Sequence, residues 1–371
     1  MLATSTSAST STSPKRDYVP SKIEKYIIDN RKELGYDPKD KKSNPTGCNI
    51  WDNSTIPPIN NDNNGDGDDS STKNMFHDYS FHLDRHIKAV KDFQPIPNLL
   101  KSIIDNNNNN NNSSSSSSIE EICSAARPHP DGLSALFSNS SNQLSYTERS
   151  GFIEPLYPPM RNHKICYQKP RNLMSLDYLI HDFESMCLQL KSHSKIVLID
   201  MGASLSFHKA TQEPPIVTLL ELYEKFGFHF DHIYGFETTF TDPSTVYKKL
   251  LPEKYMHNYH WINVGVNHTE EDKLNPLHSI LKKFTEDDFI VVKLDIDTSF
   301  IEKPLAYQIL NNTGAGEYDY HRLIDQFYFE DHVHLKELAG SWGRSMDGTI
   351  SDTLELFSGL RSKGIPAHFW P

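Results

Sequence analysis

The stretch from Lys195 to Glu237 constrains the fold more than any other part of this 371-residue chain. The apolar run Lys195–Asp200 passes at once into the small residues of Met201–Ser206, and a second apolar run, His232–Glu237, follows a helical interval. Short runs of this kind are typical of buried parallel strands. Two of them, each ending in a carboxylate, with a small-residue turn after the first, are typical of one half of a nucleoside-binding α/β sheet. The alternative is an ordinary βαβ unit whose loop is small.

The turn predicts what kind of ligand such a sheet would hold. Gly202 and Ala203 would let the backbone come close to a ligand, and Glu237 at the end of the second strand would accept hydrogen bonds from two ribose hydroxyls. A dinucleotide needs Gly-x-Gly-x-x-Gly to make room for its pyrophosphate. Here one glycine is followed by bulky Leu205 and Phe207. We therefore expect a cofactor that carries a nucleoside but no phosphate.

The same stretch resembles the first two motifs of class I S-adenosylmethionine-dependent methyltransferases. The residues that carry the resemblance are Asp200, Gly202, Ala203, Ser204 and Glu237. It implies S-adenosyl-L-methionine as the cofactor and these residues as its binding site. Asn263 is added as a predicted cofactor contact because it falls at the same edge of the expected sheet.

A second segment resembles one particular family within that class. Asp288–Asp297, followed by Ile301 and Glu302, is similar to the Lys-x-Asp-x-Glu-Gly segment of FkbM-like methyltransferases. The likeness covers roughly residues 195–371 and implies O-methylation of a small-molecule or glycan hydroxyl. Asp297 stands where that family has glutamate, no glycine follows it, and residues 208–215 form an insertion.

Apolar patterns of strand and helix alternate through the second half of the chain. This alternation predicts a Rossmann-like, doubly wound, mainly parallel sheet with helices on both faces. The expected strands are Lys195–Asp200, His232–Glu237, Tyr259–Val264, Phe289–Asp295, Leu323–Glu330 and Ile365–Trp370. The expected helices are Asp177–Leu190, Pro215–Phe226, Ser244–Leu250, Pro276–Phe284, Ile301–Leu310 and Ile350–Ser362.

Residues 1–149 are expected to form a low-complexity, partly disordered region with short helices, and residues 150–371 the Rossmann-like domain. The tracts Asn60–Ser71 and Asn106–Ser118 are too polar to bury the apolar surface that would offset chain entropy. The amphipathic pieces Ile23–Leu34 and Phe81–Leu100 are expected to pack as helices on the main domain.

The composition of the chain indicates which binding partners and which cellular compartment are expected. The formal net charge of −12 argues against a nucleic-acid surface, because phosphate binding needs clustered Lys and Arg. No apolar run reaches the length of a membrane span, and Met1–Arg16 lacks the apolar segment of a signal peptide. The default expectation is therefore the reducing cytoplasm, although an even number of cysteines permits two disulfides in a secreted chain. The cysteines, which lack Cys-x-x-Cys spacing, are Cys48, Cys123, Cys166 and Cys187.

The residues that could do chemistry gather at the carboxyl ends of the expected strands, where ligands bind in an open α/β sheet. They are Asp200, Glu237, Asn263, Asp295, Asp297 and Glu330. Methyl transfer needs positioning, a dry pocket and a base for the acceptor hydroxyl. The candidate bases are Asp295, His332 and His334. Lys293 would hold an acceptor anion or pair with a neighbouring carboxylate. The methyltransferase interpretation includes no metal.

Two other functions stay open. Asp295 and Asp297 are two residues apart, as are His332 and His334, so each pair would point the same way from an extended segment and present two ligands to a divalent ion. An apolar strand ending in Asp-x-Asp also resembles the metal and nucleotide-sugar site of GT-A glycosyltransferases, which would place the metal on Asp295 and Asp297. The second alternative is a catalytically degenerate nucleoside-binding module.

Overall fold

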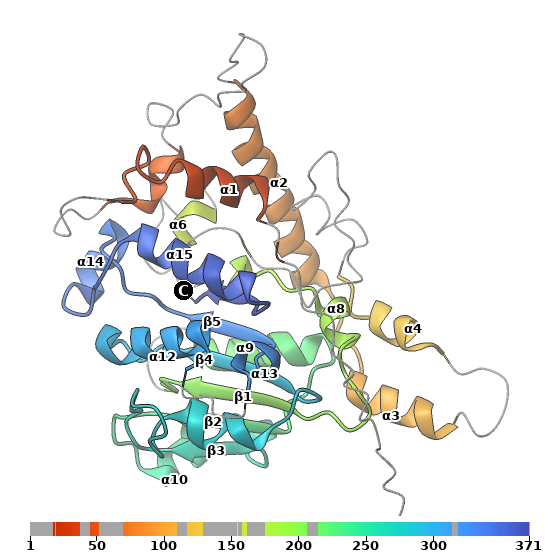
Figure 1. Cartoon of the computed structure of the whole chain (residues 1–371). Coiled ribbons are helices and arrows are strands. Elements are labelled where there is room, and N and C mark those ends of the chain that lie inside the picture. Colours follow the sequence, from red (N-terminus) through yellow and green to blue (C-terminus); the bar gives the residue numbers. More distant parts are fainter. Residues whose placement is uncertain are drawn as a thin grey trace, which may run out of the picture.

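A six-stranded, all-parallel sheet forms the centre of the structure, a computed structural model (Figure 1). The described residues are 18, 20–37, 45–51, 70–109, 117–128, 154, 158–161, 175–205, 214–313 and 318–370. The strands are β1 (Ile196–Met201), β2 (His232–Phe236), β3 (Tyr259–Ile262), β4 (Phe289–Leu294), β5 (Gln326–Phe329) and β6 (Ala367–Phe369). Their order, β3-β2-β1-β4-β5-β6, reverses between β1 and β4. The predicted Rossmann-like fold is confirmed.

Helices cover both faces of the sheet (Figure 1). Side chains of α12 (Ser299–Asn311) and α15 (Ile350–Ser362) share one apolar cluster with the sheet, and those of α8 (Phe183–Cys187) and α9 (Pro215–Lys225) share another. Alternate residues of β1 and β4 enter the two clusters, because side chains of a strand point in turn to opposite faces. The other helices are α1 (Lys22–Asp29), α2 (Ser70–Asp92), α3 (Leu99–Asn109), α4 (Ile119–Ser124), α6 (Pro158–Arg161), α10 (Pro243–Thr245), α11 (Pro276–Ser279), α13 (Tyr320–Leu323) and α14 (Lys336–Trp342).

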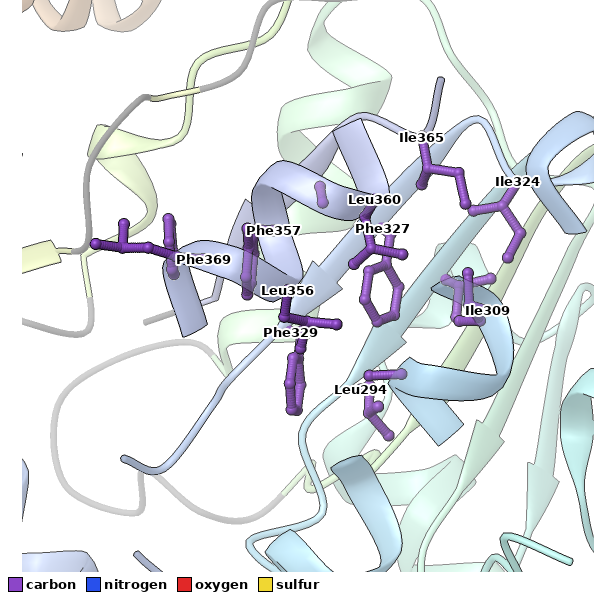
Figure 2. Close-up of a cluster of buried hydrophobic side chains, with 14 of the residues drawn as sticks. Leu294, Ile309, Ile324, Phe327, Phe329, Leu356, Phe357, Leu360, Ile365 and Phe369 are labelled. Atoms are coloured by element: carbon purple, nitrogen blue, oxygen red, sulfur yellow. The ribbon is translucent and has the colours of Figure 1, made fainter. Parts of the chain in front are cut away.

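Aromatic rings pack α15 onto the sheet, as Figure 2 shows. The ring of Phe357 stacks on that of Phe369 in β6, with 3.9 Å between centroids, and lies parallel to that of Phe329 in β5. A reciprocal capping box between Thr349 and Asp352 starts the helix by satisfying backbone N–H groups of its first turn. This packing fixes the end of the chain against β5.

Helices from the first hundred residues contribute to the same core. Ile23 and Tyr26 of α1 and Phe76 of α2 belong to the apolar cluster that contains α12 and α15. Arg361 on α15 forms a buried ion pair with Glu24 on α1, with 2.7 Å between Nη1 and Oε1. The first helices are thus joined to the sheet by both apolar contacts and charge.

The expected helix Phe81–Leu100 is wrong as one element. α2 ends at Asp92 and α3 begins at Leu99, because Pro95 and Pro97 lie between them and cannot donate helical hydrogen bonds. α3 then continues into the Asn-rich tract as far as Asn109. The expectation of disorder is therefore wrong for residues 106–109. Residues 110–116 lie outside the described part of the chain.

Local capping also changes two expected boundaries near the sheet. The helix expected over Asp177–Leu190 is a 3-10 turn followed by α8, because the Asp182 side chain accepts from the Ser185 N–H and restarts the helix. β5 begins at Gln326 rather than Leu323, because α13 occupies the preceding residues. The Asp325 side chain accepts from the Ile290 N–H, its own N–H donates to the Ile290 carbonyl, and the paired residues of β4 and β5 begin at Val291 and Gln326.

Among the described helices, none has both the length and the apolar character needed to cross a bilayer. The disulfide Cys123–Cys187 joins α4 to α8, and Cys48 is also disulfide-bonded. Cys166 lies outside the described residues.

Candidate functional site

A cavity of about 240 Å³ lies at the carboxyl ends of β1, β2, β4 and β5. This includes the point where the strand order reverses, which is where ligands bind in open α/β folds. Its volume is near the lower limit of about 300 Å³ that is usual for small-molecule sites. The lining residues are Gly202, Ser204, Pro215, Ile216, Phe236, Glu237, Thr238, Thr239, Val264, Val266, Lys293, Asp295, Ile296, Asp297, Glu330 and Trp370.

The turn after β1 forms one wall of the cavity. The N–H groups of Gly202 and Ala203 both donate to the Phe236 carbonyl, at 2.9 and 2.8 Å. Gly202 has a φ of +96°, and a Cβ at this position would lie 1.5 Å from the Asp295 carbonyl oxygen. Only glycine fits there, because the turn packs directly against the chain that follows β4. Ser204 also lines the cavity, whereas Ala203 is fully buried and is not part of the wall.

The loop after β2 forms the opposite wall. The Glu237 carboxylate lines the cavity and accepts from the Thr239 N–H, with 2.6 Å between Oε1 and N. Asn263 does not line the cavity. Its amide donates to the carbonyls of Glu237 and Thr239 and accepts from the Thr241 N–H. Asn263 therefore holds the loop that carries Glu237, which is a positioning role.

Lys293 is the buried cation of the site. Its ammonium group lies 3.0 Å from Asp200 Oδ1 on the neighbouring strand, 2.9 Å from Asp295 Oδ2 and 3.3 Å from the Gly202 carbonyl oxygen. Burial alone would lower the pKa of Lys293, but Asp200 and Asp295 raise it above its usual value, so the side chain stays charged. Of its two predicted roles, the structure contains the ion pair.

The hydrogen-bonding capacity of the Asp200 carboxylate is only partly used. The residue has no exposed surface, and its Oδ2 has no hydrogen-bond partner among the described residues. Burial raises the pKa of Asp200, while Lys293 opposes that rise. An unpaired buried carboxylate oxygen is costly unless a ligand donates to it.

Asp295 and Glu330 form a carboxyl pair at the cavity wall. Burial favours a raised pKa for Asp295, but Lys293 holds it below its usual value. The pKa of Glu330 is raised well above its usual range by burial and by the charge of Asp295. Trp370 supports Asp295 by donating from Nε1 to Oδ2, at 3.0 Å.

Asp297 does not act with Asp295. It has a φ of 59°, so the extended geometry that would make the two side chains parallel is wrong for this segment. Asp297, Glu330 and His332 instead place one potential ligand atom each within 4.8 Å of one another. His334 is not in this group and does not line the cavity. This group contains Asp297 from the predicted Asp295 and Asp297 pair, His332 from the predicted His332 and His334 pair, and Glu330.

His332 is fully buried next to these carboxylates. Burial lowers the pKa of His332, and the surrounding carboxylates only partly oppose this, so its imidazole is neutral at neutral pH. Its Nδ1 lies 3.0 Å from the Ser345 hydroxyl oxygen.

Some residues of the site carried no assigned role in the sequence. Glu330 was expected at the sheet edge among the residues that could do chemistry, but without a named role. Thr238 and Val266 were not singled out at all, and Trp370 was assigned only to the last expected strand. The one available signal was position, because each of these residues follows or ends an expected strand.

Comparisons of the chain with protein-family models, with curated proteins and with solved structures each return no match.

Proposed function

We propose that this protein is an S-adenosylmethionine-dependent methyltransferase that acts on a hydroxyl group of a small molecule or glycan. The observation that carries the proposal is the cavity between the Gly202 turn and Glu237, at the reversal point of the sheet. The assignment of the cofactor depends on the match between these groups and a phosphate-free nucleoside.

The residues present fit such a cofactor. Glu237 would accept hydrogen bonds from two ribose hydroxyls at the end of β2. Asp200 is buried behind the cavity wall and does not line it; it holds Lys293, which also donates to the Gly202 carbonyl, and so would position that wall. Val264 and Val266 supply apolar wall for a flat base. Among the described residues that line the cavity, Gly202 is the one glycine, whereas a phosphate-binding turn would need several.

S-adenosylmethionine, when bound, supplies a methyl group on a positively charged sulfur. The chain must then hold the acceptor oxygen in line with that methyl group and remove its proton. Asp295 is the base that the geometry supports best, because it lines the cavity and Lys293 keeps it ionised. Lys293, which lines the same cavity, orients Asp295 through their ion pair. His332 and His334, the other predicted bases, do not line the cavity.

The test is a calorimetric titration of the whole protein with S-adenosylmethionine and with its demethylated product. We expect both to bind, and Glu237→Gln to weaken binding by about tenfold or more, because charge-assisted hydrogen bonds are worth roughly 1–3 kcal/mol. Glu253→Gln is the matched control, since Glu253 is exposed and lies outside the cavity. Failure of both ligands to bind the unmodified protein would contradict the proposal. Binding without turnover on any acceptor would favour the degenerate module.

The metal-dependent glycosyltransferase is kept as a second candidate because of one observation, the group Asp297, Glu330 and His332. Asp295, which that function would also require at the metal, is paired with Lys293 instead. Thermal stabilisation by a nucleotide diphosphate with Mn²⁺, and none by S-adenosylmethionine, would favour this candidate.

We further propose that the protein works in an oxidising compartment. Disulfides persist mainly there, and the Cys123–Cys187 bond joins two fully buried sulfurs. Mass spectrometry after alkylation under denaturing conditions, with and without reductant, tests this on protein isolated from its native source. Free thiols at Cys123 and Cys187 in the unreduced sample would restore the cytoplasmic expectation.

A further inference from the structure

We propose that Asp297, Glu330 and His332 bind one divalent transition-metal ion at the rim of the cavity. The site supplies two carboxylate oxygens and one imidazole nitrogen from two neighbouring strand ends. This donor set suits Mn²⁺, Fe²⁺ or Zn²⁺ better than Mg²⁺ or Ca²⁺, which prefer oxygen ligands throughout.

The spacing of the donor atoms fits a shared ion. His332 Nε2 lies 3.2 Å from Glu330 Oε1 and 3.6 Å from Asp297 Oδ1. Two ligands that are each about 2.1 Å from a metal, at tetrahedral or octahedral angles, lie about 3.0–3.4 Å apart. Small rotations of the half-exposed Asp297 side chain would bring its oxygen into this range.

The orientation of the imidazole supports the same conclusion. Nδ1 lies 3.0 Å from the Ser345 hydroxyl oxygen, and on the other side of the ring Nε2 faces the side chains of Glu330 and Asp297. With Nδ1 next to Ser345, Nε2 is the ring atom that would bind a metal ion, and one ion would contact all three side chains.

Both loops that carry the ligands are firmly anchored. Glu302 on α12 accepts from the N–H groups of Ile296 and Thr298, on either side of Asp297. On the other loop, the Asp347 N–H donates to the His332 carbonyl at 2.7 Å. Asp331, between Glu330 and His332, accepts from the Thr353 hydroxyl on α15, again at 2.7 Å. Metal ligands need this kind of support to keep their geometry.

The ion would leave coordination positions open toward the cavity, because Asp297 and Glu330 both line it. If the proposed methyltransferase function holds, these positions would take an acceptor with two adjacent oxygen donors, such as a vicinal diol or a hydroxy acid. This assignment of the acceptor class rests on the proposed function, whereas the metal site does not.

The experiment uses the full chain, treated with chelator and titrated with Mn²⁺ in the absence of any cofactor. We expect one bound Mn²⁺ by electron paramagnetic resonance, with hyperfine coupling to an imidazole nitrogen. His332→Gln should remove the nitrogen coupling, and Asp297→Asn should weaken binding at least tenfold. Asparagine suits position 297, since Asn312 adopts the same left-handed backbone in this chain.

Glu271→Gln is the matched control, because Glu271 is an exposed carboxylate in the same left-handed conformation but outside the metal group. Circular dichroism confirms that each variant is folded before titration. Absence of Mn²⁺ binding by the unmodified protein, or binding that survives both Asp297→Asn and His332→Gln, would overturn the proposal. Because no cofactor is present, these outcomes are independent of the methyltransferase assignment.

Discussion

Lys293 on β4 and Asp200 on β1 are paired residues in adjacent strands, and their side chains form a buried ion pair at 3.0 Å. Asp295, two residues after Lys293, contacts the same ammonium group. A single buried cation therefore lies between two carboxylates at the edge of the sheet where the cavity opens.

We predict that Lys293→Met destabilises the protein by about 3–5 kcal/mol, because it leaves buried carboxylates without their cation. Lys191→Met is the control, since the Lys191–Asp287 pair is exposed and should contribute no more than about 1 kcal/mol. Chemical denaturation of both variants measures the difference. Equal losses of stability in the two variants would show that the buried ion pair of Lys293 stabilises the protein no more than the exposed ion pair of Lys191.

We predict that replacing Gly202 with alanine destabilises the protein at least as much as Lys293→Met does. The new Cβ would overlap the Asp295 carbonyl oxygen and would demand a positive φ, so we expect the free energy of unfolding to fall by more than about 3 kcal/mol. Binding of the proposed cofactor should be lost as well. Gly340→Ala on α14 has open space around it and should be neutral or slightly stabilising. Thermal unfolding and calorimetry report on both. A stable Gly202→Ala variant would mean that the turn can move away from β4.

We predict that protonation of Glu154 makes the protein less stable at low pH. Burial alone would raise the pKa of this fully buried carboxyl, but His368, Arg161 and Arg361 lower it to about 2, from an ordinary value of 4.5. Because the folded-state pKa is the lower one, the carboxylate stabilises the fold above pH 4.5, and this contribution of about 3 kcal/mol is lost as the pH falls toward 2.

Urea unfolding between pH 2 and 7 checks this prediction. Glu154→Gln should be less stable than the unmodified protein at pH 7 and should lose less stability on acidification. Parallel stability curves for the two proteins would exclude Glu154 as the source of the acid sensitivity.

The Cys123–Cys187 disulfide spans 64 residues of sequence. The chain-entropy model gives about 4 kcal/mol for a loop of this length, so the double variant Cys123→Ala/Cys187→Ala should unfold at a clearly lower temperature. Calorimetry without reductant isolates this bond from that of Cys48. An unchanged melting temperature would show that α3, α4 and α8 hold together through apolar contacts alone.

The strands were predictable because residues buried on both faces of a parallel sheet are apolar at successive positions, as in Ile196–Ile199. The interruptions were harder to predict. Asp182 and Asp319 cap short helices through contacts with their own neighbours, and such local competition leaves no periodic signal. Sequence position alone placed the site residues at the correct edge of the sheet.

The contacts among those residues could not be predicted in the same way. Asp295 and Asp297 were expected to act together because they are two apart, but the left-handed backbone at Asp297 directs it to residues that follow another strand. Asn263 was expected at the cofactor and instead holds the Glu237 loop. Both outcomes depend on backbone turns after the strands, which no apolar pattern encodes.

The pairing of β1 with β4 also has a kinetic consequence. Lys293 meets Asp200 across 93 residues of chain, and β2 and β3 lie between them in sequence. Closing so long a loop lowers the conformational entropy of the chain before the contacts that compensate for this loss have formed. We therefore expect this pairing to form late during folding. Until it forms, one edge of β1 lacks its partner strand, and the chain is then open to association with other chains through that edge.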